Sequence, residues 1–349
     1  MADNSLHIIP KKRRFKAMIG TGGIGAGSLF LLNGNHTLGR EESRGGKYLD
    51  ARDYCKLHII AHYVKLFCGE DFPVYPIGKV GDDDTGRRIV NEMEQAGLNI
   101  EYVHSSVGDK TLFGFCFIYP DGTGGNLTTE ESACTKVDGT FIETAIPLFM
   151  NYRGSFISLA APEVPLEARK RLLALSKEYQ GFSVASFTSA EMQEPVTHEM
   201  LPLVDLLAIN IEEAAAFLRS DLSAHKPGQV VRDTIAKVKG INPSAMLSIT
   251  AGKTGSWAWD GSQLTHVPAF KVEVKSSAGA GDAHIAGIIS GLTAGLALDE
   301  SQELGGLAGA FAVTSPHTIH PDMSRENLMA LALRSGKEIR AGLLGILKD

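Results

Sequence analysis

A chain of 349 residues, 44% of them hydrophobic and 21% charged, is long enough to bury a large core as one α/β domain or two smaller domains. The net charge of -6 provides no basic footprint, so we expect neither nucleic acid nor a membrane surface as a partner. No stretch of about 20 residues is continuously apolar, and the cysteines lack C-x-x-C spacing, which favours a cytoplasmic protein with free thiols.

The basic cluster at residues 11–14 lies in a terminal segment, residues 1–15, that we expect to be a flexible, solvated tail. A short strand is predicted at 15–19, and Gly20 to Gly25 then satisfies the pattern G-x-G-x-x-G. After a strand, this pattern is typical of a dinucleotide-binding loop if a helix follows. Residues 27–35 instead indicate a second strand ending in a turn. An NAD-dependent oxidoreductase that uses Gly20 to Gly25 is therefore a less favoured alternative.

A helix is predicted to run to about residue 67, with His58 and His62 at positions i and i+4. Such a pair can bind zinc, but no H-E-x-x-H pattern or third ligand accompanies it, so packing or surface histidines are expected.

The apolar strand at 73–80 ends in the sequence GDDDTGRR, whose consecutive aspartates would repel phosphate and exclude a Walker loop. A helix to residue 97, a strand to residue 103 and a hairpin over 111–128 follow.

From residue 141 the chain alternates helices with short apolar strands, which predicts a mainly parallel sheet with helices on both faces. The expected strands are 155–159, 182–186, 203–209, 246–250, 257–260 and 265–274. Asn210 and Glu213 stand at the start of a helix after one of these strands. On residue grounds alone they form an N-cap and its capping-box partner.

Residues 276–283 (Ser-Ser-Ala-Gly-Ala-Gly-Asp-Ala) form a glycine-rich turn that we expect to open directly into a helix. Glycines let backbone N–H groups approach an anion, and the helix N-terminus adds partial positive charge. Asp282 would lie in the first turn, beside that anion. An anion hole next to one potential base is suited to phosphoryl transfer to a hydroxyl group. A plain N-cap with an aspartate favoured by the helix dipole is the structural alternative.

This stretch resembles the second signature of the ribokinase-like (PfkB-type) carbohydrate kinases, approximately D-T-x-G-A-G-D-x-F-x-x-G. The matching residues are Gly279, Ala280, Gly281, Asp282 and Gly287, and the departures are Ser276, Ser277 and His284. Four further segments resemble family motifs in the same order along residues 20–333. They are the pair Gly45 and Gly46 with Asp50 in place of an asparagine, the set Gly81, Asp83 and Gly86, the pair Asn210 and Glu213, and the set Thr250, Gly252 and Gly255.

The resemblance implies one ribokinase-like α/β domain over residues 16–340, with a central mainly parallel sheet, helices on both faces and a small β-sheet lid. The lid is expected from about 28–44 and 110–128, and residues 341–349 are expected to form a C-terminal tail. The implied activity is ATP-dependent, Mg²⁺-assisted transfer of the γ-phosphoryl group to a hydroxyl of a sugar-like small molecule. A homodimer formed through the lid is a further expectation.

The resemblance also implies residue roles. Asp282 would be the catalytic base, and the backbone at Gly279, Ala280 and Gly281 would form the anion hole. The nucleotide would contact Asn210, Glu213, Thr250, Gly252, Lys253, Gly255 and Ser315, with Glu213 organising Mg²⁺ mostly through water. The substrate would contact Gly45, Gly46 and Asp50. A monovalent cation (K⁺) is expected near the segment that begins at Ser315.

Three departures concern positions that hold sugar hydroxyls in relatives. The usual aspartate is absent near Gly27, Asp50 replaces an asparagine, and residues 186–188 (Ser-Phe-Thr) replace D-x-N. Because an acceptor-only carboxylate favours ligands rich in hydrogen-bond donors, we expect a polyol, a nucleoside or an amino-substituted sugar. A catalytically weak nucleotide-binding relative is the alternative.

Overall fold

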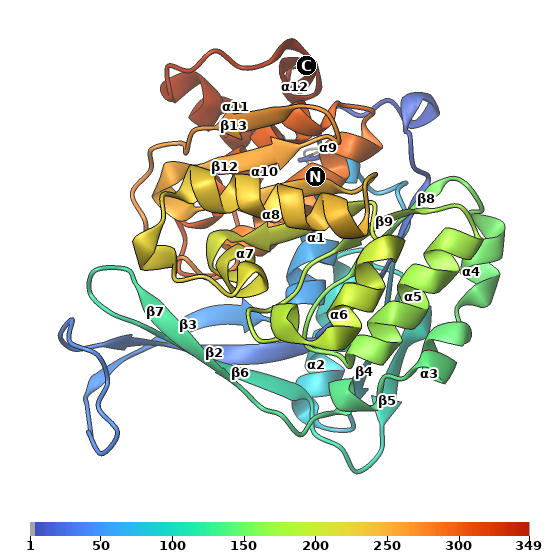
Figure 1. Cartoon of the computed structure of the whole chain (residues 1–349). Coiled ribbons are helices and arrows are strands. Elements are labelled where there is room, and N and C mark those ends of the chain that lie inside the picture. Colours follow the sequence, from blue (N-terminus) through green and yellow to red (C-terminus); the bar gives the residue numbers. More distant parts are fainter. Residues whose placement is uncertain (1–3, 349) are drawn as a thin grey trace.

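The computed structural model describes residues 4–348, and within them a nine-stranded sheet forms the centre of the molecule (Figure 1). The strand order is β13-β12-β11-β10-β9-β8-β1-β4-β5, and every neighbouring pair from β11 to β5 is parallel. The strands are β1 (Ala17–Thr21), β4 (Val74–Gly81), β5 (Val103–Ser106), β8 (Phe156–Ala160), β9 (Phe182–Ala185), β10 (Leu206–Asn210), β11 (Met246–Thr250), β12 (Ser256–Trp259) and β13 (Leu264–Val267).

Helices cover both faces of this sheet, as the alternating pattern predicts. One core cluster contains side chains of α1 (Lys56–Cys68), α2 (Asp84–Gln95), α9 (Ala280–Thr293), α10 (Leu298–Ala312), α11 (Arg325–Arg334) and α12 (Ala341–Leu347). The other contains side chains of α3 (Gly139–Glu143), α4 (Ile146–Asn151), α5 (Leu166–Glu178), α6 (Pro195–Met200), α7 (Ile211–Leu218) and α8 (Pro227–Ile241). Central strands such as β1 and β8 are buried along their whole length because both faces are covered.

A smaller sheet, the lid, extends from the lower left of the molecule in Figure 1. Its order is β3 (Gly46–Tyr54), β2 (Gly25–Leu32), β6 (Leu112–Ile118) and β7 (Gly124–Thr128). The predicted hairpin is therefore present, but the predicted first part of the lid at 28–44 is only partly correct. Residues 33–45 form a connection rich in glycine and polar residues, and the remaining lid strand is β3.

The prediction that a strand, and not a helix, follows Gly20 to Gly25 is confirmed. These residues lead from β1 into β2, so the dinucleotide-binding alternative loses its structural context. The glycines in this turn are required by close packing, since a Cβ at Gly22 would lie 2.7 Å from Ala161 Cβ. The family resemblance also implies that the segment beginning at Gly45 and Gly46 opens the first helix, and this expectation is wrong. Gly46 begins β3, and α1 starts only at Lys56.

The expected terminal tails are also packed where the structure describes them. Leu6 and Ile8 are buried, and the Leu6 N–H donates to the Phe67 carbonyl at 2.9 Å. At the other end, residues 341–347 form α12 with Leu343 fully buried. Apolar side chains in these segments belong to the same core cluster as those of α1, α9 and α11. Residues 1–3 and 349 of the expected tails lie outside the described residues.

Residues 268–279 do not continue β13 to residue 274 as expected but run as irregular chain into α9. The alternation of lysine, valine and glutamate in this stretch is strand-like, yet a strand also needs a neighbouring strand to pair with. Here the Lys275 N–H donates instead to the Val313 carbonyl, at 2.8 Å, at the end of α10.

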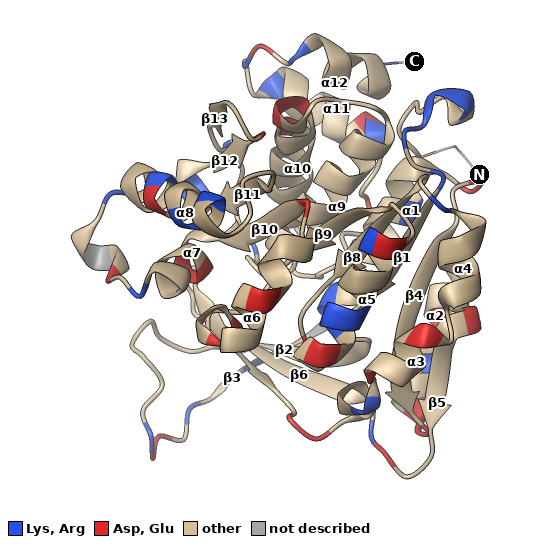
Figure 2. Cartoon of the chain, turned by 45° about the vertical axis from the view of Figure 1, so that its right-hand side comes forward, with Lys and Arg blue, Asp and Glu red and all other residues tan. Residues whose placement is uncertain are grey.

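The surface carries charges of both signs without segregation. In Figure 2, acidic and basic residues are interspersed along helices such as α5 and α8. Within residues 4–348, no helix combines the length and apolarity that a bilayer-spanning segment requires. Cys55, Cys68, Cys116 and Cys134 are all free thiols, as predicted, and three of them are buried. A cytoplasmic location stays a prediction.

Candidate active site

Asp282 lies in the first turn of α9, and only 8% of its surface is exposed. The N-cap residue, Gly279, has a φ of 77°, and a Cβ at this position would lie 2.7 Å from the Thr318 carbonyl oxygen. Glycine meets both constraints without strain. Because the first N–H groups of a helix have no intrahelical partner and carry partial positive charge, this turn can bind an anion directly beside the Asp282 carboxylate.

Lys56, the first residue of α1, faces this carboxylate. Its Nζ lies 3.9 Å from Asp282 Oδ1, and α1 packs along α9. Interaction with Asp282 raises the pKa of the Lys56 amine above its usual value. Burial raises the pKa of Asp282, and the Lys56 charge opposes that shift. Lys56 therefore helps to keep the buried Asp282 ionised, the state that a general base requires.

A second carboxylate, Glu163, contacts the same helix start. Its Oε2 accepts a hydrogen bond from the Lys56 backbone N–H at 3.1 Å. Glu163 follows β8 and has a φ of 77°, an unusual backbone conformation for a non-glycine residue. A Cβ at Gly23 would overlap the Glu163 side chain, so the glycine provides its space. Burial raises the pKa of Glu163 to about 7, against the opposing effect of Lys56.

Asp53, near the end of β3, is a third buried carboxylate, with 7% of its surface exposed. It pairs with Gly27 across the lid, and a Cβ at Gly27 would overlap its Oδ2 atom. The Cys116 thiol donates to Asp53 Oδ2 at 3.3 Å, from β6 on the same face of the lid. Desolvation, together with the negative charge of Asp282, raises the pKa of Asp53. A carboxylate therefore does lie beside Gly27, and it comes from the neighbouring strand.

Asn210 and Glu213 form the capping box of α7 that the residues alone predicted. The Glu213 N–H donates to Asn210 Oδ1, and the Asn210 N–H donates to Glu213 Oε2, each at 2.8 Å. Burial raises the pKa of Glu213 to about 7, and its carboxyl interacts electrostatically with Lys56 and Asp282. The capping role is therefore real, and the same side chain also belongs to the charged cluster around Asp282.

The remaining nucleotide-site candidates follow β11 and α10. Thr250 ends β11 directly beside Asn210 on β10. The turn that follows has φ values of 49° at Gly252 and 99° at Gly255, which favour glycine, and Lys253 between them is exposed. Ser315, after α10, is 5% exposed and its Oγ accepts from the His317 N–H at 3.1 Å.

The structure brings Asp282, Glu213, Asn210 and Thr250 to the carboxyl-terminal edge of the parallel strands, where open α/β sheets bind ligands. It does not bring Gly45 and Gly46 there. Gly46 pairs with Leu32 at the far end of β2, whereas Asp53 pairs with Gly27 at the end next to β1. Asp50 lies within β3, and its side chain is outside the described residues.

Three residues of the cluster were missed by sequence reasoning: Asp53, Lys56 and Glu163. Asp53 and Lys56 belong to no motif, because their positions depend on the pairing of β3 with β2 and on the packing of α1 against α9. A signal for Glu163 did exist. It is a charged residue three positions after a mostly apolar strand, and such positions often face the site in a parallel sheet.

The cluster suits a hydrated divalent cation. The carboxylates of Glu163, Glu213 and Asp282 interact with a single amine, Lys56, and Asp53 adds a further carboxylate that interacts with Asp282, so carboxylates outnumber cations in this cluster. Among the side chains that the structure describes, which do not include that of Asp50, no three His, Cys, Asp or Glu residues are arranged as direct metal ligands. Mg²⁺ is usually bound through one or two carboxylates, several waters and substrate phosphates. The residues present fit that mode, with Glu213 as a candidate contact.

Comparisons with known proteins agree on one family. A family model described as pfkB family carbohydrate kinase matches residues 60–325. The adenosine kinase of Schizophyllum commune is 27% identical over 261 residues, which cover 68% of this chain and 73% of that protein. The fructoselysine 6-kinase of Shigella flexneri is 23% identical over 229 residues, or 65% and 77% of the two chains. A ribokinase from Cryptococcus neoformans var. grubii serotype A in complex with ADP superposes with a TM-score of 0.75 at 18% identity, covering 91% of this chain and 99% of that chain.

Proposed function

Because the chain belongs to the pfkB family of carbohydrate kinases, we propose that it transfers the γ-phosphoryl group of ATP to a hydroxyl group of a sugar-like acceptor, with Asp282 as the general base. The predicted ribokinase-like fold and phosphotransferase class are confirmed. The observation that carries the proposed mechanism is the buried Asp282 carboxylate at the glycine-capped start of α9, opposed by the Lys56 amine.

In this mechanism Asp282 accepts the proton of the acceptor hydroxyl as that oxygen attacks the γ-phosphorus, and the bond to the β,γ-bridging oxygen of ATP breaks. The N–H groups at Ala280 to Asp282 stabilise charge on the transferred group, which is the main catalytic task in phosphoryl transfer. Asn210, Thr250, Gly252, Lys253, Gly255 and Ser315 would position the nucleotide. Mg²⁺, when bound, would supply charge neutralisation on the phosphates. A monovalent cation near Ser315 stays an expectation.

The acceptor pocket would be formed between the inner face of the lid and the start of α1. The polar groups described there are the carboxylates of Asp53 and Glu163 and the amine of Lys56. In their ionised form these carboxylates only accept hydrogen bonds, so at pH values above their raised pKa values this wall selects acceptors that present several donors. We therefore propose a polyol, a nucleoside or an amino-substituted sugar as the acceptor, with Asp53 contacting its hydroxyl or amino groups.

Steady-state kinetics with ATP and a panel of ribose, fructose, polyols, nucleosides and amino sugars tests this function. The expected result is efficient turnover of a donor-rich acceptor and poor turnover of free ribose and fructose. Phosphorylation of either free sugar with kcat/KM of roughly 10⁴ M⁻¹s⁻¹ or above would contradict the acceptor assignment. ATP binding without turnover of any panel member would favour the alternative of a catalytically weak nucleotide-binding protein. The displacement of Gly45 and Gly46 from the site is the observation that keeps this alternative open.

Replacing Lys56 with methionine should change the pH dependence of kcat. Without the amine, burial and the nearby carboxylates raise the pKa of Asp282 further, so the base becomes ionised only at higher pH. The acidic limb of the kcat profile should therefore move to higher pH, and a move of one pH unit lowers the rate on that limb about tenfold. Lys170→Met, at an exposed ion pair with Glu199, is the matched control. An unchanged acidic limb in Lys56→Met would refute the proposed role of the amine.

Glu213→Gln separates the capping role from the metal role. Glutamine at the third helical position can still serve a capping box, so the fold of α7 should persist while the charge is lost. We expect the variant to need a higher Mg²⁺ concentration for half-maximal activity, with a smaller effect on the KM for the acceptor. The measurement is a Mg²⁺ titration at saturating ATP and acceptor. An unchanged titration would leave Glu213 with its capping role alone.

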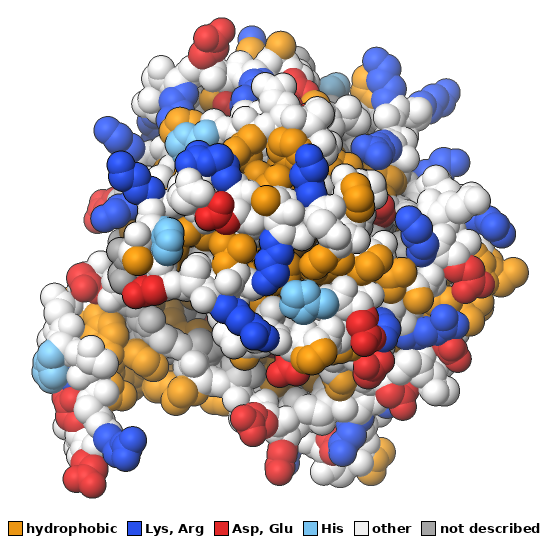
Figure 3. All heavy atoms as spheres, viewed as in Figure 1, with side chains coloured by type: hydrophobic (Ala, Val, Ile, Leu, Met, Phe, Trp, Pro, Cys, Tyr) orange, Lys and Arg blue, Asp and Glu red, His pale blue; other side chains and the backbone are white. Residues whose placement is uncertain are grey.

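The outer face of the lid supports the proposed homodimer. Register places Phe30, Tyr48, Phe113, Phe115, Phe117 and Leu127 on this face. Tyr48, Phe113 and Leu127 are 58%, 41% and 64% exposed, and hydrophobic side chains gather over this region at the lower left of Figure 3. A contiguous apolar patch of this kind is typical of a protein interface. Light scattering should find a dimer at micromolar concentration and a monomer for Leu127→Glu. A wild-type protein that is monomeric under these conditions would disprove the proposed homodimer.

A further inference from the structure

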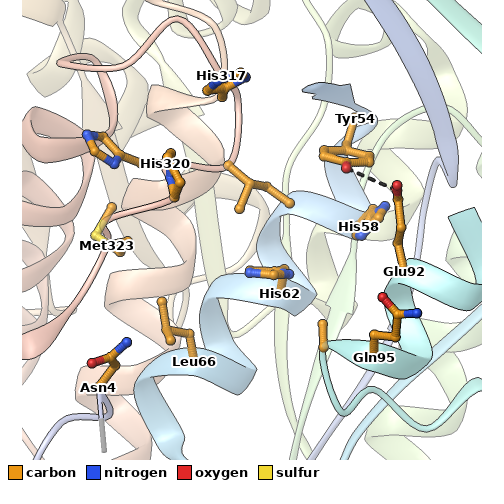
Figure 4. Close-up of a pocket in the computed structure, with 13 residues that line it drawn as sticks. Asn4, Tyr54, His58, His62, Leu66, Glu92, Gln95, His317, His320 and Met323 are labelled. Carbon is orange, nitrogen blue, oxygen red and sulfur yellow. Dashed lines mark hydrogen bonds between the residues drawn. The ribbon is translucent and has the colours of Figure 1, made fainter. Parts of the chain in front are cut away.

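A hollow of about 620 Å³ lies between α1, the end of α2 and the segment from His317 to Met323. We call it the histidine pocket, because His58, His62, His317 and His320 all line it. Figure 4 shows His58 and His62 on α1 on one side and His317 and His320 on the opposite segment. Its volume is in the range that accommodates a small organic ligand. None of the residues assigned above to phosphoryl transfer lines it.

One wall of the pocket is a row of rings. The Tyr54 and His58 ring centroids are 4.4 Å apart, and those of His58 and His62 are 6.4 Å apart. Apolar side chains, among them Ile319 and Met323, form much of the other side. Rings facing aliphatic side chains favour a flat ligand that stacks on one wall and makes van der Waals contact with the other.

The charges around the pocket are few and already paired. The Glu92 carboxylate accepts a hydrogen bond from the Tyr54 hydroxyl, with 3.0 Å between the oxygens. It also forms an ion pair with Arg88, with Oε1 3.2 Å from Nη1. Both ring nitrogens of His320 are engaged, Nε2 with Thr314 Oγ1 at 3.1 Å and Nδ1 with the Asp322 N–H at 3.0 Å. Burial lowers the pKa of His58 to about 3 and that of His62 to about 4, so these imidazoles are neutral near pH 7. A phosphorylated ligand would find no unpaired cation among these groups.

The pocket nevertheless contains groups that can form hydrogen bonds with a ligand. His58 is only 1% exposed, and among the described residues its Nδ1 atom has no hydrogen-bond partner. A neutral imidazole offers both a donor and an acceptor, and the amide of Gln95 at the rim offers both as well. A ligand edge that carries donors and acceptors together suits these groups better than an ion does. Metal binding is disfavoured here, because the described side chains include no cluster of three or more ligating groups in a suitable arrangement.

The pocket borders the proposed phosphate site through one residue, Thr318. The Tyr54 N–H donates to Thr318 Oγ1 at 3.0 Å, and the Tyr63 hydroxyl donates to the Thr318 carbonyl at 3.2 Å. That carbonyl is the atom that approaches Gly279 at the start of α9. Movement of the segment from His317 to His320 on ligand binding would therefore reach the anion-binding turn.

From these observations we propose that the histidine pocket is a second ligand site, which binds an uncharged planar nitrogen heterocycle of the nucleobase class and is linked to nucleotide binding through Thr318. The ligand ring stacks on His62, and its edge hydrogen-bonds His58 and Gln95, while Tyr54 closes the end of the same wall. The site is separate from the phosphoryl-transfer site, so its occupancy does not depend on the acceptor proposed above.

Isothermal titration calorimetry with adenine as the probe tests the site, with the nucleotide site saturated by Mg²⁺ and a non-hydrolysable ATP analogue. Adenine has no hydroxyl to phosphorylate, so the measurement reads binding and stays informative if phosphoryl transfer fails. Wild-type protein should bind adenine, and His62→Leu and Gln95→Trp should each weaken binding about tenfold or more. His225→Leu, at an exposed histidine outside the pocket, is the control and should bind as wild type. Absence of adenine binding, or equal binding by all four proteins, would overturn the proposal.

The coupling between the histidine pocket and the nucleotide site is tested by a separate measurement. Because coupling between sites is reciprocal, adenine should change the affinity for the ATP analogue by about fivefold or more in wild-type protein. The effect should disappear in Gln95→Trp, which distinguishes it from competition at the nucleotide site. An equal effect in wild type and Gln95→Trp would refute the linkage through Thr318.

Discussion

Asp282→Asn is expected to lower kcat by about 10²–10⁴-fold while leaving ATP affinity nearly unchanged. The amide keeps the size of the carboxylate, so the buried first turn of α9 should retain its shape, but it cannot accept the proton of the acceptor hydroxyl. Rapid-quench measurement of phosphoryl transfer, together with direct titration of ATP, separates the two quantities. Near-wild-type turnover by a folded Asp282→Asn protein would eliminate the proposed base.

Asp299→Asn provides a matched control for this experiment. Asp299 also lies in the first turn of a long helix, α10, and pairs with Arg340 at 3.2 Å. Asp299→Asn removes a negative charge that is favourable at a helix N-terminus and should cost on the order of 0.3–1 kcal/mol of helix stability. Asp282→Asn loses the same dipole interaction but also relieves the desolvation that raises the pKa of Asp282, so it should be no more destabilising than the control. Only the Asp282 variant should lose catalysis. Equal losses of activity would show that the charge stabilises the fold and does not act as the base.

Gly279→Ala should both destabilise the protein and reduce activity. Its φ of 77° is unfavourable for alanine by roughly 1–2 kcal/mol, and the new Cβ would approach the Thr318 carbonyl oxygen at 2.7 Å. The start of α9 must shift to relieve this contact, and its N–H groups then lose their alignment on the transferred phosphoryl group. Loss of one such donor typically reduces kcat by about 10²–10³-fold. Thermal unfolding and steady-state kinetics on the same preparation measure both effects.

Gly281→Ala is the companion variant. A Cβ at Gly281 meets no atom within 4 Å, and the residue lies inside the helix. Alanine is favoured over glycine in a helix by about 0.5–1 kcal/mol, so this variant should be at least as stable as wild type. A fall in its activity without a fall in stability would indicate that the phosphoryl group passes directly over Gly281. Wild-type stability and turnover of Gly279→Ala would instead remove the basis for the anion hole.

The sequence by itself determined those features of the protein that form between residues close together in the chain. The capping box of Asn210 and Glu213 joins positions three apart, and it forms as expected. The turn from Gly279 into α9 combines a left-handed glycine with a helix N-terminus, and both are properties of adjacent residues. The alternation of short apolar strands with helices likewise predicted a mainly parallel sheet covered on both faces, because burial on both sides requires such strands.

The tertiary structure alone decided which side chains surround Asp282. Lys56 is 226 positions away in the chain and reaches Asp282 because α1 packs on α9 (282 - 56 = 226). Asp53 is placed by the register of β3 against β2, and a shift of one residue would turn it to the outer face of the lid. The placement of Gly45 and Gly46 was decided in the same way. Their spacing resembles a family motif, but the length of β3 places them at the far end of the lid, because strand length and pairing partner are set by contacts between segments.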